Sequence, residues 1–300
     1  MTPSSTFDHL LDRVSAGGRL SSDDIAQLAA TPDILSVGML ADALRRHMHG
    51  TRVTYVRVAV CAIDGSCADA VSPVAREIRI TGTPATLATA AAAVQSATAV
   101  AGERPVTGFS WLDVERVASA GGVPLARALA ELRAAGLDAL AELPLDLVED
   151  EAAAVDALRR AGFERLRLTI ASAPAAAART ALMVRAAALQ ERLGGIQAIG
   201  PLPTSLDPLR RTTGYDDVKA VAIARLAAPN IPTIQVDWQR YGPKLAQVAL
   251  TFGADDLDNV TASDEAPDGR RRAPLEELRR NIETAGFSPA ERDGRFHLVP

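Results

Sequence analysis

Three acidic residues stand close together after a short apolar stretch in the C-terminal part of the chain. Asp255, Asp256 and Asp258 lie in the run GADDLDNV. On a β-strand, Asp256 and Asp258 share one face and Asp255 points to the other. Two carboxylates on one face can accept a proton or bind a hard cation such as Mg²⁺. Asp256 and Asp258 are therefore candidate ligand-binding residues, although capping of the next turn and closure of the fold would explain them equally well.

A group of guanidinium and hydroxyl side chains precedes a predicted helix. The run RRTTG holds Arg211, Thr212 and Thr213. These groups suit a carboxylate or a phosphate-like ligand, so the three residues are candidate ligand-binding residues. The alternative is a helix cap, in which Asp216 and Asp217 supply acidic groups to the first turn.

Two further candidates follow in the next predicted strand and helix. Trp238 ends the strand, and Gln247 lies in the helix behind it. At the mouth of a barrel, the Trp238 indole could stack on a planar ring of a ligand. Packing in the core is the alternative for this side chain.

The two cysteines, Cys61 and Cys67, are separated by five residues. This is not a zinc-ligand spacing, and two cysteines do not make a disulfide framework. They are weak candidates for ligands of a metal cluster, and the alternative is one buried thiol on a strand and one thiol in a loop. The sequence has four histidines and lacks the P-loop, His-Glu-x-x-His and Gly-x-Ser-x-Gly motifs. A Ser-His-Asp relay or a zinc site of the His/Cys kind is therefore hard to build.

The elements that must position these residues follow an alternating pattern. From residue 52 onward, short β-branched runs alternate with amphipathic stretches. This alternation predicts a parallel β/α architecture, and about eight such units favour a closed (β/α)8 barrel. An open doubly wound sheet is the alternative, but no Gly-x-Gly-x-x-Gly follows the first strand. The predicted strands are Val53–Ala62, Glu77–Thr81, Arg104–Phe109, Leu137–Ala141, Arg165–Ile170, Gly195–Ile199, Ile231–Trp238, Asp255–Val260 and a short last one at Phe296–Val299.

Residues 1–50 are predicted to form a helical extension, and residues 51–300 the barrel with a last helix and strand. Ser21 followed by Asp23 and Asp24 is typical of a helix start. Gly50 is a suitable residue just past a helix end.

Composition and charge exclude several classes of partner. The 300 residues carry a formal net charge of -5, so a basic nucleic-acid-binding surface is not expected. No run of eighteen apolar residues predicts a membrane span. The N-terminal residues lack the basic start and apolar core of a secretory signal, so we expect a cytoplasmic protein.

A series of short motifs runs through residues 194–260. They include, in order, RTTG at 211–214, NIP at 230–232, GPKLAQ at 242–247 and GADDLD at 253–258. With this order and spacing, the segment resembles the radical S-adenosylmethionine (SAM) enzymes of the futalosine route to menaquinone, the group of aminofutalosine synthase and dehypoxanthine futalosine cyclase. Sparser matches upstream extend the resemblance over nearly the whole chain. It implies a (β/α)8 barrel of the radical SAM kind.

The sequence departs from that group at its chemical centre. The group carries Cys-x3-Cys-x2-Cys just after the first strand, where three thiolates hold a [4Fe–4S] cluster. If Cys67 were the last of the three, the others would fall on Val60 and Asp64. A register that starts at Cys61 also meets no second cysteine. Neither register supplies more than one thiolate.

We therefore expect a degenerate, cluster-less relative that has no cofactor and is tied to menaquinone biosynthesis. It would bind a small-molecule ligand, or an active radical SAM relative as its protein partner. Two alternatives stay open. One is an active radical SAM enzyme in which Cys61, Cys67 and a further ligand hold a [4Fe–4S] cluster that binds SAM. The other is a barrel with lyase or hydrolase chemistry at Asp256 and Asp258.

Overall fold

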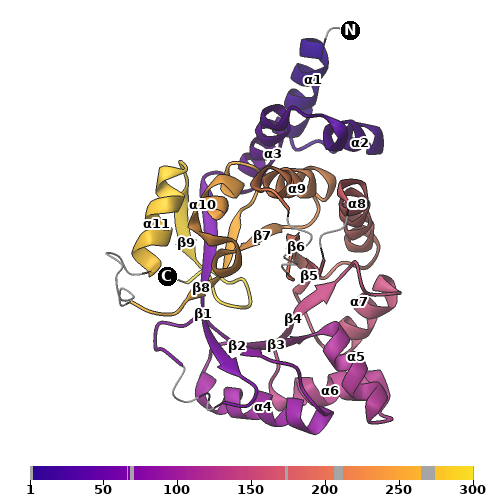
Figure 1. The fold of residues 1–300 in the computed structure, drawn as a ribbon, viewed down its shortest axis with the longest axis vertical. Helices are drawn as coiled ribbons and strands as arrows, with labels where there is room; N and C mark the ends of the chain where they lie inside the picture. The colour runs from indigo at the N-terminus through magenta and orange to yellow at the C-terminus, as the bar shows by residue number, and fades with distance from the viewer. Residues whose placement is uncertain are drawn as a thin grey trace.

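The computed structural model describes residues 3–65, 67, 71–172, 175–205, 212–264 and 274–299. Eight parallel strands form a closed barrel, because β1 pairs with both β2 and β8 (Figure 1). The predicted (β/α)8 barrel is therefore confirmed. The barrel strands are β1 Arg52–Ala62, β2 Glu77–Thr81, β3 Val106–Ser110, β4 Ala139–Pro144, β5 Leu166–Ile170, β6 Ile196–Pro203, β7 Thr233–Asp237 and β8 Asp256–Thr261.

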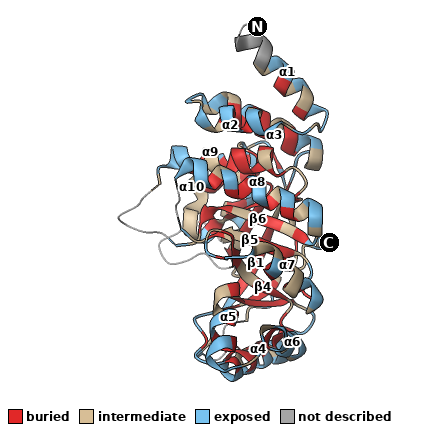
Figure 2. Ribbon diagram, turned by 90° about the vertical axis from the view of Figure 1, so that its right-hand side faces the viewer, coloured by how far each residue is buried: buried red, intermediate tan, exposed pale blue. Residues whose placement is uncertain are grey.

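Helices surround the barrel, and their inward faces bury apolar side chains against the outer faces of the strands (Figure 2). Three of them precede β1: α1 Pro3–Ser15, α2 Ser22–Ala30 and α3 Ile34–His49. The others are α4 Leu87–Ala101, α5 Trp111–Ala120, α6 Leu125–Ala135, α7 Glu151–Arg160, α8 Ala176–Leu193, α9 Gly214–Ala227, α10 Trp238–Leu250 and α11 Pro274–Thr284.

Local sequence signals explain where several helices begin and end. Ser21 caps α2, since its hydroxyl accepts from the Asp24 amide while Asp24 accepts from the Ser21 amide. Ser110 and Asp113 form the same reciprocal cap at the start of α5. Gly50 ends α3 with a positive φ of 62°, a conformation that favours glycine. Two serine caps and a glycine stop thus define three helix ends.

The N-terminal helices have an apolar core of their own. Figures 1 and 2 show α1–α3 projecting beyond the barrel at one end. Leu40 and Leu44 of α3 are buried together with Ile223 and Leu226 of α9. The helices are therefore anchored to the barrel through one of its outer helices.

The C-terminal segment departs from the expectation. Residues Phe296–Val299 do not form the predicted last strand. Instead β9, Ser288–Glu291, pairs in parallel with the first residues of β1, below the part of β1 that pairs with β2. The sequence pattern did not predict this strand, because proline, here at position 289, is disfavoured within a sheet interior and the residues around it are polar. Beyond β9 the chain turns under the barrel, where the Arg292 side chain is buried.

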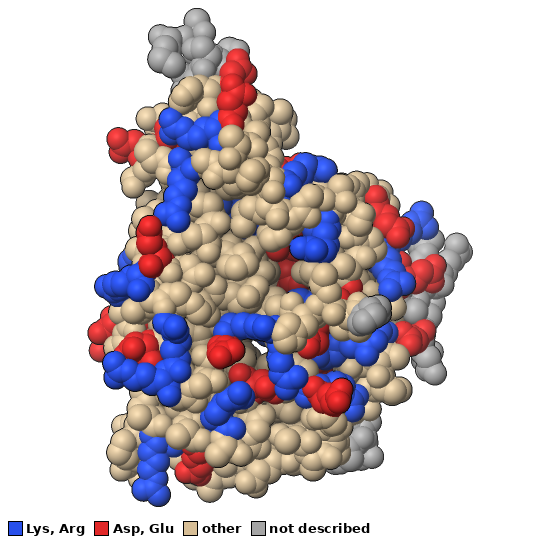
Figure 3. Space-filling view, turned by 180° about the vertical axis from the view of Figure 1, so that it is seen from behind, with Lys and Arg blue, Asp and Glu red and all other residues tan. Residues whose placement is uncertain are grey.

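None of the helices within the described ranges has the length and apolar character needed to cross a bilayer. On the face shown in Figure 3, basic and acidic side chains are interspersed rather than separated. Ion pairs of opposite charges also occur on the barrel, as between Arg295 and Asp138, with Nη2 and Oδ1 3.0 Å apart.

Candidate functional site at the barrel mouth

The carboxyl ends of the barrel strands surround a cavity of about 520 Å³. This is the end of a (β/α)8 barrel where ligands bind and chemistry takes place. Polar and apolar side chains share its lining. The charged and hydrogen-bonding residues are Arg79, Thr81, Thr83, Ser110, Asp113, Glu142, Thr169, Thr204, Gln235, Asp237, Arg240, Tyr241, Asp258 and Asn259.

The floor of the cavity is a bidentate ion pair between β2 and β8. Arg79 places Nη1 2.8 Å from Oδ2 of Asp258 and Nη2 2.9 Å from Oδ1. The same guanidinium contacts Glu77 on its own strand, with Nη2 2.7 Å from Oε1. Burial alone would raise the pKa of Asp258, but the adjacent Arg79 cation lowers it below its ordinary value. Asp258 is therefore held as a carboxylate at neutral pH.

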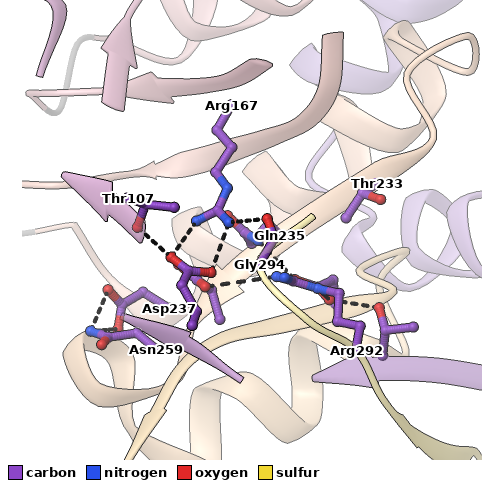
Figure 4. A network of polar contacts seen from close by, with 12 residues as sticks. Thr107, Arg167, Thr233, Gln235, Asp237, Asn259, Arg292 and Gly294 are labelled. Carbon is purple, nitrogen blue, oxygen red and sulfur yellow. Dashed lines mark hydrogen bonds and ion pairs between the residues drawn. The ribbon is translucent and has the colours of Figure 1, made fainter. Parts of the chain in front are cut away.

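A second layer of ion pairs fills the barrel below this floor (Figure 4). Arg167 of β5 donates from Nη2 to Oε2 of Glu77 at 2.8 Å, and Thr107 donates to Oε1 at 2.6 Å. Burial would raise the pKa of Glu77, but the Arg167 and Arg79 cations hold it well below its usual range. Glu77 is therefore ionised and paired on both sides.

The lowest layer joins β8 to the C-terminal segment. Arg292 donates from Nε and Nη2 to the two oxygens of Asp256, at 2.6 and 2.7 Å. Thr54 and Gln235 donate to the same carboxylate at 2.6 and 2.8 Å. Each charge in these layers has a counter-charge, as burial in a protein interior requires. The mouth is therefore closed from below.

The rim of the cavity carries a carboxyl group of a different kind. Asp237 ends β7 and caps α10, accepting from the Arg240 amide at 2.8 Å. The side-chain Nδ2 of Asn259 donates to Oδ2 of Asp237 at 3.2 Å (Figure 4). Burial and the neighbouring charge of Asp258 raise the pKa of Asp237. Of the two neighbouring carboxyl groups, Asp237 therefore holds a proton more readily than Asp258.

The two cysteines are joined to each other by a disulfide bond. This corrects the expectation of two separate thiols. Cys61 is 3% exposed and points into the apolar layer outside β1, whereas its neighbour Val60 lines the mouth. Successive strand residues point to opposite faces, so Cys61 cannot face the mouth together with Val60.

A [4Fe–4S] cluster does not fit the residues of the mouth. Such a cluster needs thiolates, and the cavity lining contains neither cysteine nor histidine. The position that faces the mouth at the end of β1 is Val60. Within the described ranges, no three His, Cys, Asp or Glu side chains converge as metal ligands.

The predicted site residues do not come together at one place. Asp258 lines the mouth, but Asp256 is fully buried beneath it and lies on the same inner face, as the strand pattern predicted. Asp255 points outward and pairs with Arg225 of α9. Arg211 lies outside the described residues.

The remaining candidates stand apart from the cavity. Thr213 caps α9, where its hydroxyl accepts from the Asp216 amide at 3.2 Å. Thr212, immediately before it, is half-buried and does not line the mouth. Trp238 is buried in the apolar core, and Gln247 is half-buried on α10, also away from the mouth lining.

Four residues of the charged interior escaped the sequence reasoning: Glu77, Arg79, Arg167 and Arg292. Their signal was available in part. Glu77 and Arg79 alternate with Ile78 and Ile80 on β2, so the charged face had to point into the barrel. Arg292 had no such signal, because it follows β9, a strand that the sequence pattern did not predict.

The strands thus form a (β/α)8 barrel with a partly polar cavity at their carboxyl ends. Residues 204–300 match the family model described as the CofH/MqnC C-terminal region. An Archaeoglobus fulgidus protein named 5-amino-6-(D-ribitylamino)uracil--L-tyrosine 4-hydroxyphenyl transferase is 39% identical over 124 residues, which cover 37% of this chain and 36% of that protein. The chain thus spans little more than a third of this relative.

A longer but weaker similarity covers the whole chain. The cyclic dehypoxanthine futalosine synthase of Streptomyces coelicolor is 24% identical over 364 residues, covering 100% of this chain and 90% of that protein. The crystal structure of methylornithine synthase (PylB) has the same fold, with a TM-score of 0.67, 16% identity and coverage of 94% of this chain and 97% of that chain. The similarities of the chain to the CofH/MqnC C-terminal region and to a futalosine synthase support the resemblance that its motifs indicated.

Proposed function

We propose that this protein is a cluster-less relative of the futalosine-route enzymes, which binds a ligand in the barrel mouth or pairs with an active relative. Its association with menaquinone biosynthesis is part of the proposal and rests on the similarity to futalosine synthases. Action in the cytoplasm stays a prediction.

The single observation that carries the proposal is the side-chain arrangement at the end of β1. Val60 occupies the mouth-facing position, and Cys61 is turned outward and bonded to Cys67. A cluster would need three thiolates pointing into the mouth. The arrangement supports a barrel that keeps its cavity without the group that starts radical chemistry.

The charges of the mouth indicate which ligands it favours. Asp113, Glu142, Asp237 and Asp258 line it together with two arginines, Arg79 and Arg240. Arg79 is already neutralised by Asp258 and Glu77. Asp237 pairs with Arg240 and Asp113 with Arg116. Of the four acids, Glu142 is the one without an ion pair among the described residues, so the mouth favours a polar ligand with amino or hydroxyl groups over an anion.

The two alternatives find no comparable support. Cluster ligation by both cysteines would require the disulfide to open and Cys61 to turn inward from the apolar layer. Lyase or hydrolase chemistry at Asp256 would require access to a fully buried carboxylate that Arg292 and Thr54 already occupy.

The test compares wild type with a variant in which the three cysteines are restored. Val60→Cys and Asp64→Cys, combined with Cys61→Ser, would give Cys-x3-Cys-x2-Cys ending at Cys67. Both proteins are reconstituted anaerobically with iron and sulfide, and iron per chain is measured. We expect no stoichiometric iron in wild type and a gain in the variant. About four irons per wild-type chain would refute the proposal.

A further inference from the structure

A second, smaller cavity of about 100 Å³ lies between α8 and α9, separate from the mouth. Most of its wall is apolar, formed by Met183 and Ala220 together with Pro201 and Ile223. Its charged residues are two cations, Arg179 and Lys219, and one acid, Asp216, and the hydroxyl-bearing Thr180 and Tyr215 also line it. The two cavities share none of their lining residues.

Arg179 is the unusual member of this wall. It is only 8% exposed, and its Nε and Nη1 atoms are buried without a hydrogen-bond partner. None of the residues that the structure describes forms an ion pair with it. Buried guanidinium N–H groups without an acceptor are unfavourable, so the Nε and Nη1 atoms of Arg179 call for an acceptor that the described residues do not supply.

The other charged groups of the wall are already engaged. Lys219 donates from Nζ to the Ala29 and Thr31 carbonyl oxygens, at 2.7 and 2.5 Å. Asp216 accepts at Oδ2 from the hydroxyl and the amide of Thr213, at 2.7 and 3.2 Å, as part of the α9 cap. The pKa of Asp216 is lowered mainly by its hydrogen bonds from Thr213, and also by the Arg179 charge, but no hydrogen bond or ion pair joins Asp216 to the Arg179 guanidinium.

Asp217 is a further acid near Arg179, but it does not form an ion pair with the guanidinium. Burial raises its pKa, although the Arg179 charge acts in the opposite direction. Its Oδ1 atom is itself buried without a partner.

A helix end contributes to the same wall. Ala175 begins α8 without a side-chain cap, and Ala176 of the first turn lines the cavity. The free amides of a helix start favour negative charge. The start of α8 and the Arg179 guanidinium therefore both favour a negative charge in this cavity.

We propose that this cavity binds a small aliphatic monocarboxylate, whose carboxylate pairs with the Arg179 guanidinium. The planar fork of arginine matches a carboxylate in two hydrogen bonds. The apolar wall around Met183 and Ile223 accepts a short branched hydrocarbon chain, and the volume excludes a large one. The site does not depend on the function of the mouth.

Isobutyrate is the probe, and isobutyramide is its neutral counterpart of the same shape. Isothermal titration in a zwitterionic buffer at fixed chloride measures both. We expect wild type to bind isobutyrate and to show no measurable binding of isobutyramide. Arg179→Met should weaken isobutyrate binding roughly 100-fold, because two charge-assisted hydrogen bonds are lost. Arg179→Lys keeps the positive charge but lacks the planar guanidinium. Its affinity for isobutyrate should therefore lie between those of wild type and Arg179→Met.

Arg185→Met is the matched control on the same helix. Arg185 is exposed and pairs with Glu151, so its loss should leave isobutyrate binding unchanged. The midpoint of thermal unfolding is a second measurement. Added isobutyrate should raise this midpoint in wild type and leave it unchanged in Arg179→Met, because a ligand that binds the folded state stabilises it. Equal binding of the acid and the amide, unchanged binding in Arg179→Met, or no binding to wild type would each overturn the proposal.

Discussion

Arg292 lies beneath the barrel with Nε 2.6 Å from Oδ1 of Asp256 and Nη2 2.7 Å from Oδ2. Arg292 belongs to the C-terminal segment, and Asp256 is the first residue of β8. This pair closes the barrel from below. Above it, further ion pairs form the floor of the mouth, so the cavity opens only at the carboxyl ends of the strands.

Breaking this pair should destabilise the protein. Arg292→Met leaves Asp256 buried and charged, and we expect the free energy of unfolding to fall by about 3–5 kcal/mol. Urea denaturation measures it. Arg160→Met is the control, because Arg160 and Asp156 form an exposed pair whose loss should cost less than about 1 kcal/mol. Equal effects of the two substitutions would contradict the assignment of the Arg292 pair.

The charged interior also makes stability depend on pH. The pKa values of Glu77 and Asp258 are lowered in the folded state by Arg167 and Arg79. Their contribution is therefore complete above the unfolded values of about 4 and is lost as the pH falls through the folded values below them. We expect the free energy of unfolding to fall in acid from about pH 4 downward.

Glu77→Gln should flatten this acid dependence. The substitution leaves Arg167 and Arg79 without one counter-charge, so stability at pH 7 falls as well. Urea denaturation at a series of pH values measures both effects. Glu191→Gln, at an exposed position, serves as the control and should follow the wild-type curve. A Glu77→Gln curve parallel to that of wild type would show that Glu77 does not carry the effect.

The disulfide makes a prediction about thiols. Protein purified without reductant and unfolded in guanidinium should show no reactive thiol, and two after reduction. Closing so short a loop stabilises the fold by about 2 kcal/mol in the chain-entropy account. Cys67→Ser should lose this amount and become insensitive to reductant. Two reactive thiols before reduction would instead restore the interpretation of separate cysteines.

Much of the architecture was predictable from local patterns. Glu77–Thr81 was predicted with the bounds observed for β2, and β1 and β5 begin within one residue of the prediction. Strong alternation of β-branched residues with helical stretches carries this information. The last strand was wrong, because Ser288–Glu291 lacks β-branched residues and pairs only with a distant part of the chain.

The site was less accessible to sequence reasoning. Asp258 was singled out and does line the mouth, but its partner Arg79 lies 179 residues away in the chain. The cysteine pairing was missed for a similar reason: the spacing of Cys61 and Cys67 says nothing about how the turn brings them together. The Arg79–Asp258 pair and the disulfide both depend on how the folded chain brings the side chains together. A single sequence shows no pattern from which such contacts can be predicted.

The central claim is that this barrel has lost radical chemistry together with its cluster. The most direct measurement is reductive cleavage of SAM by anaerobically reconstituted wild-type protein in the presence of a strong reductant. We predict no cleavage above the protein-free blank. Turnover of SAM that disappears in Cys61→Ala or Cys67→Ala would contradict the account and establish an active radical enzyme with an unusual ligand set.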